Sequence, residues 1–169
     1  MVIVPARSPL QLAREALSYE PLPRPQPVTS PPNAETYVNL QTWLAVTGWE
    51  PVETSASVPG LTTTVVAAPE RALWTMGDGE TVSCSGPGEV YDRSLPEEAQ
   101  DTDCSHVYRR SSAAVGVDNN YPASVTVTYH VTWSASDGSR GDLGLLPVTT
   151  NFPMRVREVQ VVNVYPRHA

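Results

Sequence analysis

The sequence contains no lysine, and this absence removes one kind of site. All eleven basic residues among its 169 residues are arginine. A nucleotide-binding P-loop needs the pattern GxxxxGK[ST], because its lysine contacts the terminal phosphates. We therefore do not expect this chain to bind a nucleotide through such a loop.

Charge is also scarce, and its balance is acidic. Charged residues make up 17% of the sequence, and the formal net charge is −7. Nucleic acids and anionic membranes attract basic surfaces, so we expect neither as a partner. The low charge favours a β-rich protein whose surface carries threonine and serine rather than charged helices. No apolar run is long enough to cross a bilayer, so we expect no membrane insertion in this segment.

Cysteine is limited to Cys84 and Cys104, which are too few and too widely spaced for a usual zinc site. We expect one disulfide that closes a long loop, and two reduced, buried cysteines are the alternative. A disulfide indicates an oxidising compartment, so the sequence predicts an extracellular or cell-envelope protein. The apolar part of the N-terminus is too short for a signal peptide. We expect an export signal to lie upstream of residue 1 or to have been removed.

The N-terminal region has the pattern of a short helix followed by a proline-rich arm. Residues 8–18 predict a helix in which Ser8 is the N-cap. Three apolar residues share its predicted packing face: Leu10, Ala13 and Leu17. Residues 21–32 hold six prolines in twelve positions. This composition favours an extended segment that is either a linker or a strap lying over the domain.

The clearest strand is predicted over residues 123–135, where apolar and polar residues alternate strictly. Odd-numbered residues from Val125 to Trp133 are expected to be buried and their even-numbered neighbours exposed. Residues 136–142 are turn-rich and predict the start of a long connection. The last strand is expected over residues 154–164, where a change of phase near Glu158 indicates a β-bulge or an edge.

Shorter strands separated by glycine and proline turns are predicted from residue 36 onward. Residues 36–46 are expected to form one strand, and Pro59-Gly60 a turn between the next two. The spacing of Ser94 and Glu97 predicts a helix inside the cysteine loop. Six to eight strands of this kind predict an all-β, antiparallel β-sandwich. The expected organisation is a helix with a proline-rich arm (1–35), a β-sandwich (36–165) and a tail (166–169).

One series of motifs resembles a known family. Its residues are, in chain order, Trp74, Gly77, Asp78, Gly79, His106 and Tyr108. This order resembles the PKD domain, an immunoglobulin-like β-sandwich with Trp, Gly-Asp-Gly and His-x-Tyr motifs. Met76 stands where that family usually has phenylalanine, and the gap that carries the cysteines is longer than usual. These departures resemble a variant found in exported actinobacterial proteins of unassigned role, over residues 55–164.

The resemblance implies an immunoglobulin-like sandwich in which the motif residues are structural. PKD domains lie mostly outside the cell and act as spacer, adhesion or interaction modules, in some cases beside hydrolases. His106 is then expected to belong to the core with Tyr108 and to hydrogen-bond to the backbone. His130 lies on the polar face of the long strand, where the sequence suggests no partner for it.

Gly77-Asp78-Gly79 is the segment most open to a chemical role. A catalytic aspartate needs a second ionisable group in a contrasting environment, and only Glu80 is close in sequence. A calcium-binding EF-hand loop needs a series of acids at fixed offsets, which the sequence lacks. We therefore predict a hairpin turn in which the glycines adopt positive φ and Asp78 caps backbone amides.

Two further groups are candidates for binding. Tyr37, Trp43 and Trp49 form an aromatic segment that either binds sugars or peptides or receives the N-terminal arm. Asp101 and Asp103 are the calcium candidates within an acidic loop whose plainer interpretation is a solvated surface. We expect no catalytic residues, no bound metal and no cofactor.

The combined prediction is a non-catalytic, extracellular interaction or spacer module at the cell envelope, and not an enzyme. The alternative is a carbohydrate-binding or accessory module of a secreted enzyme complex. A protein or a cell-wall polysaccharide is the expected class of partner.

Overall fold

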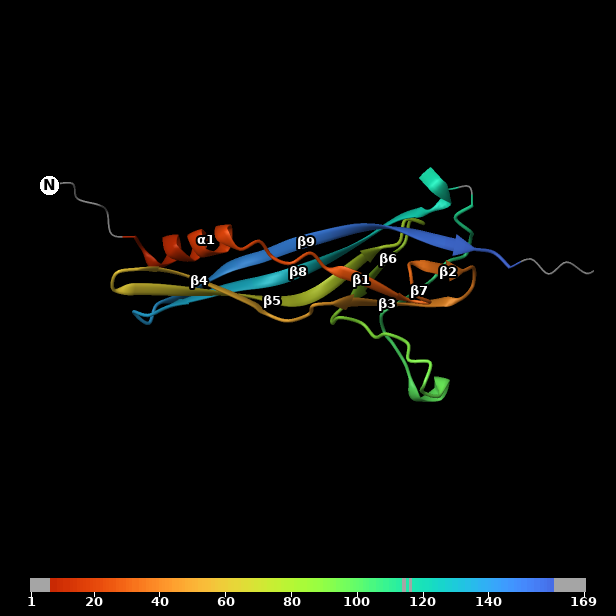
Figure 1. Cartoon of the computed structure of the whole chain (residues 1–169), viewed down its shortest axis with the longest axis horizontal. Coiled ribbons are helices and arrows are strands. Elements are labelled where there is room, and N and C mark those ends of the chain that lie inside the picture. The colour runs from red at the N-terminus through yellow and green to blue at the C-terminus, as the bar shows by residue number, and fades with distance from the viewer. Residues whose placement is uncertain (1–6, 114, 116, 160–169) are drawn as a thin grey trace, which may run out of the picture.

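The computed structural model describes residues 7–113, 115 and 117–159, and this part of the chain is mostly β (Figure 1). Its strands are β1 (Gln26–Ser30), β2 (Glu35–Tyr37), β3 (Gln41–Thr47), β4 (Val52–Val58), β5 (Leu61–Thr75), β6 (Thr81–Cys84), β7 (Ser105–Val107), β8 (Tyr121–Ala135) and β9 (Arg140–Arg157). Its helices are α1 (Pro9–Tyr19) and the short 3₁₀ turns η1 (Glu97–Ala99) and η2 (Val117–Asn119). Within these ranges, no helix has the length and apolar character needed to cross a membrane.

The described strands form two sheets. The larger sheet has the order β2-β9-β8-β5-β4, with β6 pairing with the far end of β5, and the smaller has the order β1-β3-β7. The all-β, sandwich-like fold is thus confirmed. Strands β2 and β9 pair in parallel, so the expectation of a purely antiparallel fold is wrong at this pair.

Strand β8 has the two faces that its alternating sequence predicts. The odd-numbered residues from Val125 to Val131 are buried, because they face the core. Trp133 is only partly buried, and it follows a register shift between Val131 and Thr132. The even-numbered neighbours are mostly half-buried rather than exposed, since β5 and β9 flank them on both sides.

Strand β9 is much longer than predicted. It begins at Arg140, directly after a tight turn in which Ala135 donates its N–H to the carbonyl of Ser139 over 2.8 Å. The predicted long connection is therefore wrong. The sequence misleads here because Pro147 and Pro153 resemble loop residues. Along most of its length β9 pairs with β8 alone among the described strands, and an edge strand tolerates proline.

The irregularity expected near Glu158 coincides with the end of β9 at Arg157. A register shift of β9 lies instead near Leu143, between the residues that face Val131 and Thr132. Residues 160–164, the rest of the predicted last strand, lie outside the described residues.

The segment predicted as one strand over residues 36–46 is two strands joined by a turn. Asn39 has a φ of 64°, and Leu40 donates its N–H to the carbonyl of Tyr37 over 3.2 Å. The chain therefore reverses between β2 and β3, and the two strands join different sheets. Five successive residues of β3 are buried, so both faces of this strand are covered.

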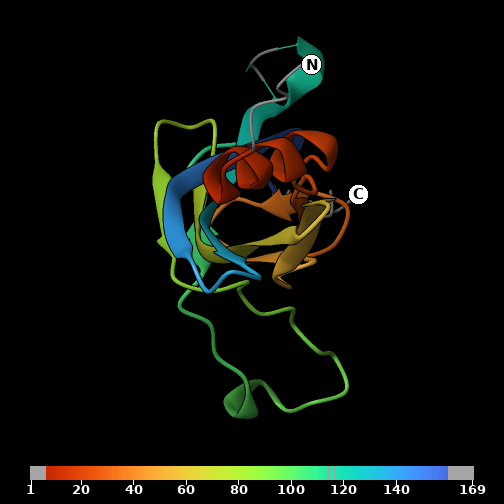
Figure 2. The ribbon, with the colours of Figure 1, turned by 90° about the vertical axis from the view of Figure 1, so that its left-hand side faces the viewer.

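The N-terminal arm packs against the sandwich. Helix α1 starts at the predicted N-cap Ser8, and the structure adds a capping box in which Ser8 and Gln11 exchange hydrogen bonds. Of the predicted face, Ala13 is buried and Leu17 is partly buried against the core, whereas Leu10 is exposed. Leu12 and Ala16 complete the buried face. The helix lies against β4, β5 and β8 (Figure 2). The proline-rich strap (residues 21–32) contains β1, which pairs with β3 and so belongs to the small sheet.

The predicted disulfide between Cys84 and Cys104 is present, with the two Cα atoms 5.5 Å apart. It joins the end of β6 to the start of β7 and closes the disulfide loop (residues 85–103). Inside this loop the predicted helix is only the 3₁₀ turn η1, which follows Pro96 rather than Ser94. Figures 1 and 2 both show η1 near the tip of a loop that extends away from the sheets.

Removal of the disulfide is expected to lower the free energy of unfolding by roughly 3 kcal/mol, the value for a closed loop of this length. The change is Cys84→Ala with Cys104→Ala, measured by urea denaturation at equilibrium. The native chain in reductant should show the same loss, while the double variant should be insensitive to reductant. A native chain that unfolds at the same urea concentration with and without reductant contradicts this prediction.

Candidate functional site

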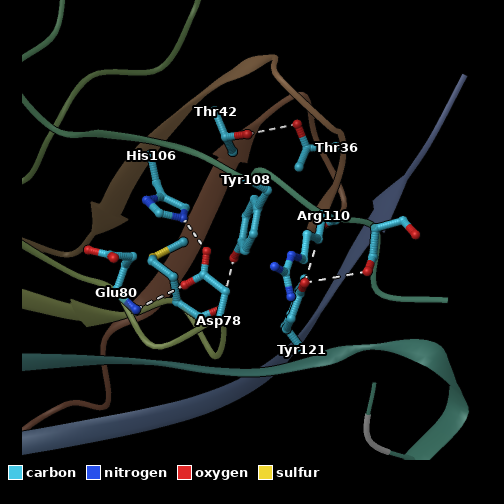
Figure 3. A network of polar contacts seen from close by, with 10 residues as sticks. Thr36, Thr42, Asp78, Glu80, His106, Tyr108, Arg110 and Tyr121 are labelled. Carbon is cyan, nitrogen blue, oxygen red and sulfur yellow. Dashed lines mark hydrogen bonds and ion pairs between the residues drawn. The ribbon is translucent and has the colours of Figure 1, made fainter. Parts of the chain in front are cut away.

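The Gly77-Asp78-Gly79 segment is the predicted hairpin turn, and it joins β5 to β6. The N–H of Met76 donates to the carbonyl of Glu80 over 3.0 Å, which closes the turn. Asp78 accepts a hydrogen bond from the N–H of Glu80 through Oδ1 over 3.1 Å (Figure 3). Gly77 has a φ of 81°, and a Cβ there would lie 2.8 Å from the carbonyl oxygen of Pro122. The turn therefore sits directly on the start of β8.

The second oxygen of Asp78 contacts His106 on β7. Asp78 Oδ2 and His106 Nε2 are 2.7 Å apart, and the two side chains are 15% and 10% exposed. The expectation that His106 hydrogen-bonds to the backbone is therefore corrected, because its partner is the carboxylate of the turn. One aspartate thus caps its own hairpin and holds a strand of the opposite sheet (Figure 3).

Tyr108 closes this cluster from the inside. Its ring is fully buried, lies edge-on to His106 with centroids 4.6 Å apart, and stacks on Tyr121 of β8 at 5.2 Å. Its hydroxyl donates to the carbonyl of Met76 over 3.0 Å. Burial, and to a lesser extent the charge of Asp78, raise the pKa of Tyr108 well above its ordinary value, so it remains a neutral donor. Through these contacts, the cluster holds the two sheets together.

A second region of interest lies where the disulfide loop runs beside the small sheet. Gly88 forms a bridge with Ala45 of β3, and a Cβ on Gly88 would collide with the carbonyl oxygen of Leu44. Tyr91 donates its N–H to Ser30 Oγ on β1 over 3.1 Å. The loop is thus anchored to two neighbouring strands before it projects outward.

The outer part of the disulfide loop is held together by one side chain. Gln100 accepts a hydrogen bond from the N–H of Asp92 over 2.7 Å and donates to the carbonyls of Asp92 and Leu95. Asp92 in turn accepts from the N–H and the hydroxyl of Ser94, which lowers the pKa of the Asp92 carboxyl. The loop therefore has an internal framework of its own.

A groove of about 780 Å³ lies between the strap and the disulfide loop. One wall is the strap segment 28–32, and the floor carries Leu40, Gln41 and Trp43. The loop supplies the other wall: Val90, Tyr91, Arg93, Glu97, Gln100 and Asp101. We call this surface the strap–loop groove.

The strap–loop groove is lined by both apolar and charged side chains. The rings of Trp43 and Tyr91 meet edge-to-face with centroids 5.4 Å apart. Beside them, the side chains of Leu40 and Val90 are 41% and 55% exposed. Large exposed aliphatic residues grouped around aromatic rings are typical of interaction surfaces. The charged lining residues are Arg93, Glu97 and Asp101.

The structure separates the three predicted aromatic candidates. Trp43 lies in the floor of the strap–loop groove, with 9% of its surface exposed. Trp49 is partly buried against the core, and Tyr37 is exposed at the end of β2, where it pairs with Arg157 of β9. Sequence reasoning missed Tyr91, although it is the one aromatic residue inside the disulfide loop.

The calcium candidates do not form a ligand cluster. Asp101 accepts a hydrogen bond from the N–H of Thr102, and it lines the groove, whereas Asp103 does not. In the described part of the chain, no group of three or more His, Cys, Asp or Glu residues is arranged to hold a metal ion.

A second polar cluster surrounds His130, for which the sequence suggested no partner. His130 Nε2 lies 2.6 Å from Asp142 Oδ2, and Nδ1 lies 3.3 Å from Glu70 Oε1. Register shifts of β5 and β9 place both acids beside this one residue of β8. Since both ring nitrogens face carboxylates, the imidazolium is favoured and the pKa of His130 is raised, chiefly through its hydrogen bond to Asp142.

No protein-family model matches this chain, and neither does any curated protein or solved structure with which it was compared. Its function is therefore inferred from its own residues.

The contact between Asp78 and His106 is expected to stabilise the fold. Asp78→Ala should lower the free energy of unfolding by about 1–3 kcal/mol, because it leaves a covered imidazole without its partner. The matched control is Asp137→Ala, which removes a similar cap from the exposed β8–β9 turn but touches no histidine. Urea denaturation measures both variants. Equal losses for the two aspartates would show that the histidine contact adds nothing.

His130 is expected to titrate above its ordinary pKa of 6.5. A raised folded-state pKa stabilises the fold fully below the unfolded value, and this contribution is lost as the pH rises through the folded value. NMR titration of the imidazole measures it directly. Asp142→Asn should lower this pKa more than Glu70→Gln, because the Asp142 contact is the larger cause. A His130 pKa at or below 6.5 would contradict the ion cluster.

Proposed function

We propose that this protein is a non-catalytic interaction module of PKD type that works outside the cytoplasm. It holds a ligand in the strap–loop groove. The observation that carries the proposal is the position of this groove, between a loop closed by a disulfide and a strap paired into the small sheet.

The disulfide supports a place in an oxidising compartment, because such bonds persist mainly outside the cytosol. The contacts of the motif residues support the PKD resemblance. Trp74 is fully buried, Asp78 lies in a hairpin turn, and His106 and Tyr108 pack against that turn. Because these motif residues hold the two sheets together, we assign ligand binding to another surface.

A carbohydrate-binding role is the second candidate, and one observation favours it. The edge-to-face pair of Trp43 and Tyr91 lies in a concave surface, and aromatic rings in such positions pack against sugar rings. An accessory module of a secreted enzyme complex would use the groove in this way.

The proposal predicts that ligand binding depends on the strap–loop groove. The purified chain is immobilised and tested for binding to cell-wall polysaccharide and to defined peptides by surface plasmon resonance. Val90→Asp should weaken binding at least about tenfold, because it places a charge on an exposed apolar wall of the groove.

The matched control is Leu73→Asp, which places the same charge on an exposed leucine of β5 outside the groove. This variant should bind as the native chain does. Binding that survives Val90→Asp, or the absence of binding to any of these ligands, would contradict the proposed function.

A further inference from the structure

We propose that the ligand of the strap–loop groove is an extended, proline-containing peptide of a partner protein that carries an arginine or lysine. The basic residue lies against Glu97 and Asp101, and the apolar residues lie between Leu40 and Val90. This inference rests on the proposed function and names the class of ligand.

The shape of the groove fits an extended chain. Five consecutive residues of the strap, 28–32, line one wall. The β1 part of this wall, Val28 to Ser30, is extended, and the chain bends from Pro31 onward. Pro31 and Pro32 carry no backbone N–H, so this part of the wall offers few donors for β-strand addition. A proline-rich ligand needs few such hydrogen bonds, because its own backbone lacks the same donors.

The apolar lining residues of the groove are of the kind that binds polyproline segments. Such segments dock into grooves lined by aromatic side chains. Trp43 and Tyr91 form an edge-to-face pair in the groove, and Leu40 and Val90 leave aliphatic surface exposed in the same groove. The pair is held in place, since Tyr91 is tied through its N–H to Ser30. Little ordering is then needed when a ligand binds.

The charged lining residues of the groove favour a ligand of opposite charge. The disulfide loop holds six acidic residues and one arginine, and so carries five of the seven net negative charges of the chain. Glu97 and Asp101 line the groove and take part in no salt bridge among the described residues. Two carboxylates and one guanidinium give the groove lining a net negative charge, which favours a cationic residue.

The polar groups fit a sugar less well. An amide side chain offers a sugar both hydrogen-bond donors and an acceptor, whereas a carboxylate only accepts. Of the two amides that line the groove, Gln100 is occupied by the backbone of its own loop, and Gln41 donates to Ser105 Oγ over 3.1 Å. What remains available is aliphatic surface and charge, which suits a peptide.

The test uses the full, disulfide-bonded chain and fluorescence anisotropy. The probes are labelled peptides of about ten residues, made of proline and leucine with one arginine, lysine or glutamate at varied positions. Peptides with arginine or lysine should bind with a Kd below about 1 mM. Those with glutamate should bind at least about tenfold more weakly, and added salt should reduce this difference.

Matched pairs of variants locate the site. Glu97→Gln with Asp101→Asn should abolish the preference for basic over acidic peptides. Glu98→Gln with Asp103→Asn makes the same change of charge in the same loop, outside the groove lining, and should retain the preference. Val90→Asp should weaken the binding of every peptide that carries apolar residues. Because Val90 is exposed, we expect the fold to tolerate this change. Circular dichroism confirms folding of each variant.

Several outcomes would overturn the peptide assignment. These are no binding of the basic peptides, equal binding of basic and acidic ones, or equal losses in both double variants. Polysaccharide binding that requires Val90, without peptide binding, would leave the proposed function standing and remove this inference. A dimer in sedimentation that Val90→Asp dissociates would make a second copy the occupant. If neither polysaccharide nor peptide binds, both proposals fail.

Discussion

The large sheet has one apolar face, and the rest of the molecule is arranged to cover it. Buried side chains alternate along β8 and include Val125 and Val131, so this face must be shielded from water. Helix α1 packs over β4, β5 and β8, and the small sheet contributes Leu44 and Val46 to the same core. The strap connects these two covers. It is therefore a structural part of the sandwich, and its position beside the disulfide loop follows from that role.

Local patterns predicted much of this fold, and long-range pairing decided the rest. The alternation of β8, the N-cap at Ser8 and the Pro59-Gly60 turn are features of neighbouring residues, and the structure contains all three. The length of β9 depended on an edge position that no local pattern reveals. The strap was described as extended, but its pairing with β3 depends on a partner further along the chain.

The candidate site was accessible from the sequence only in fragments. The motif supplied both Asp78 and His106, yet their contact joins residues 28 positions apart, on two sheets. Trp43 was identified as an aromatic candidate, whereas Tyr91 reaches it through an anchor to Ser30 that spans 61 positions. Such contacts follow from the topology. The sequence shows that the disulfide loop is acidic. Only the structure shows that Glu97 and Asp101 line a groove.

The residues of the disulfide loop affect both the stability of the fold and the proposed binding. Its acidic residues repel one another, so the loop needs restraints that do not depend on charge. The disulfide, the close approach of Gly88 to β3 and the framework around Gln100 are such restraints. They keep Glu97 and Asp101 in the lining of the groove at a cost in electrostatic free energy. A cationic ligand reduces that repulsion on binding, so it stabilises the folded chain through the same residues that recognise it. In the proposed complex, the basic ligand therefore stabilises the loop that recognises it.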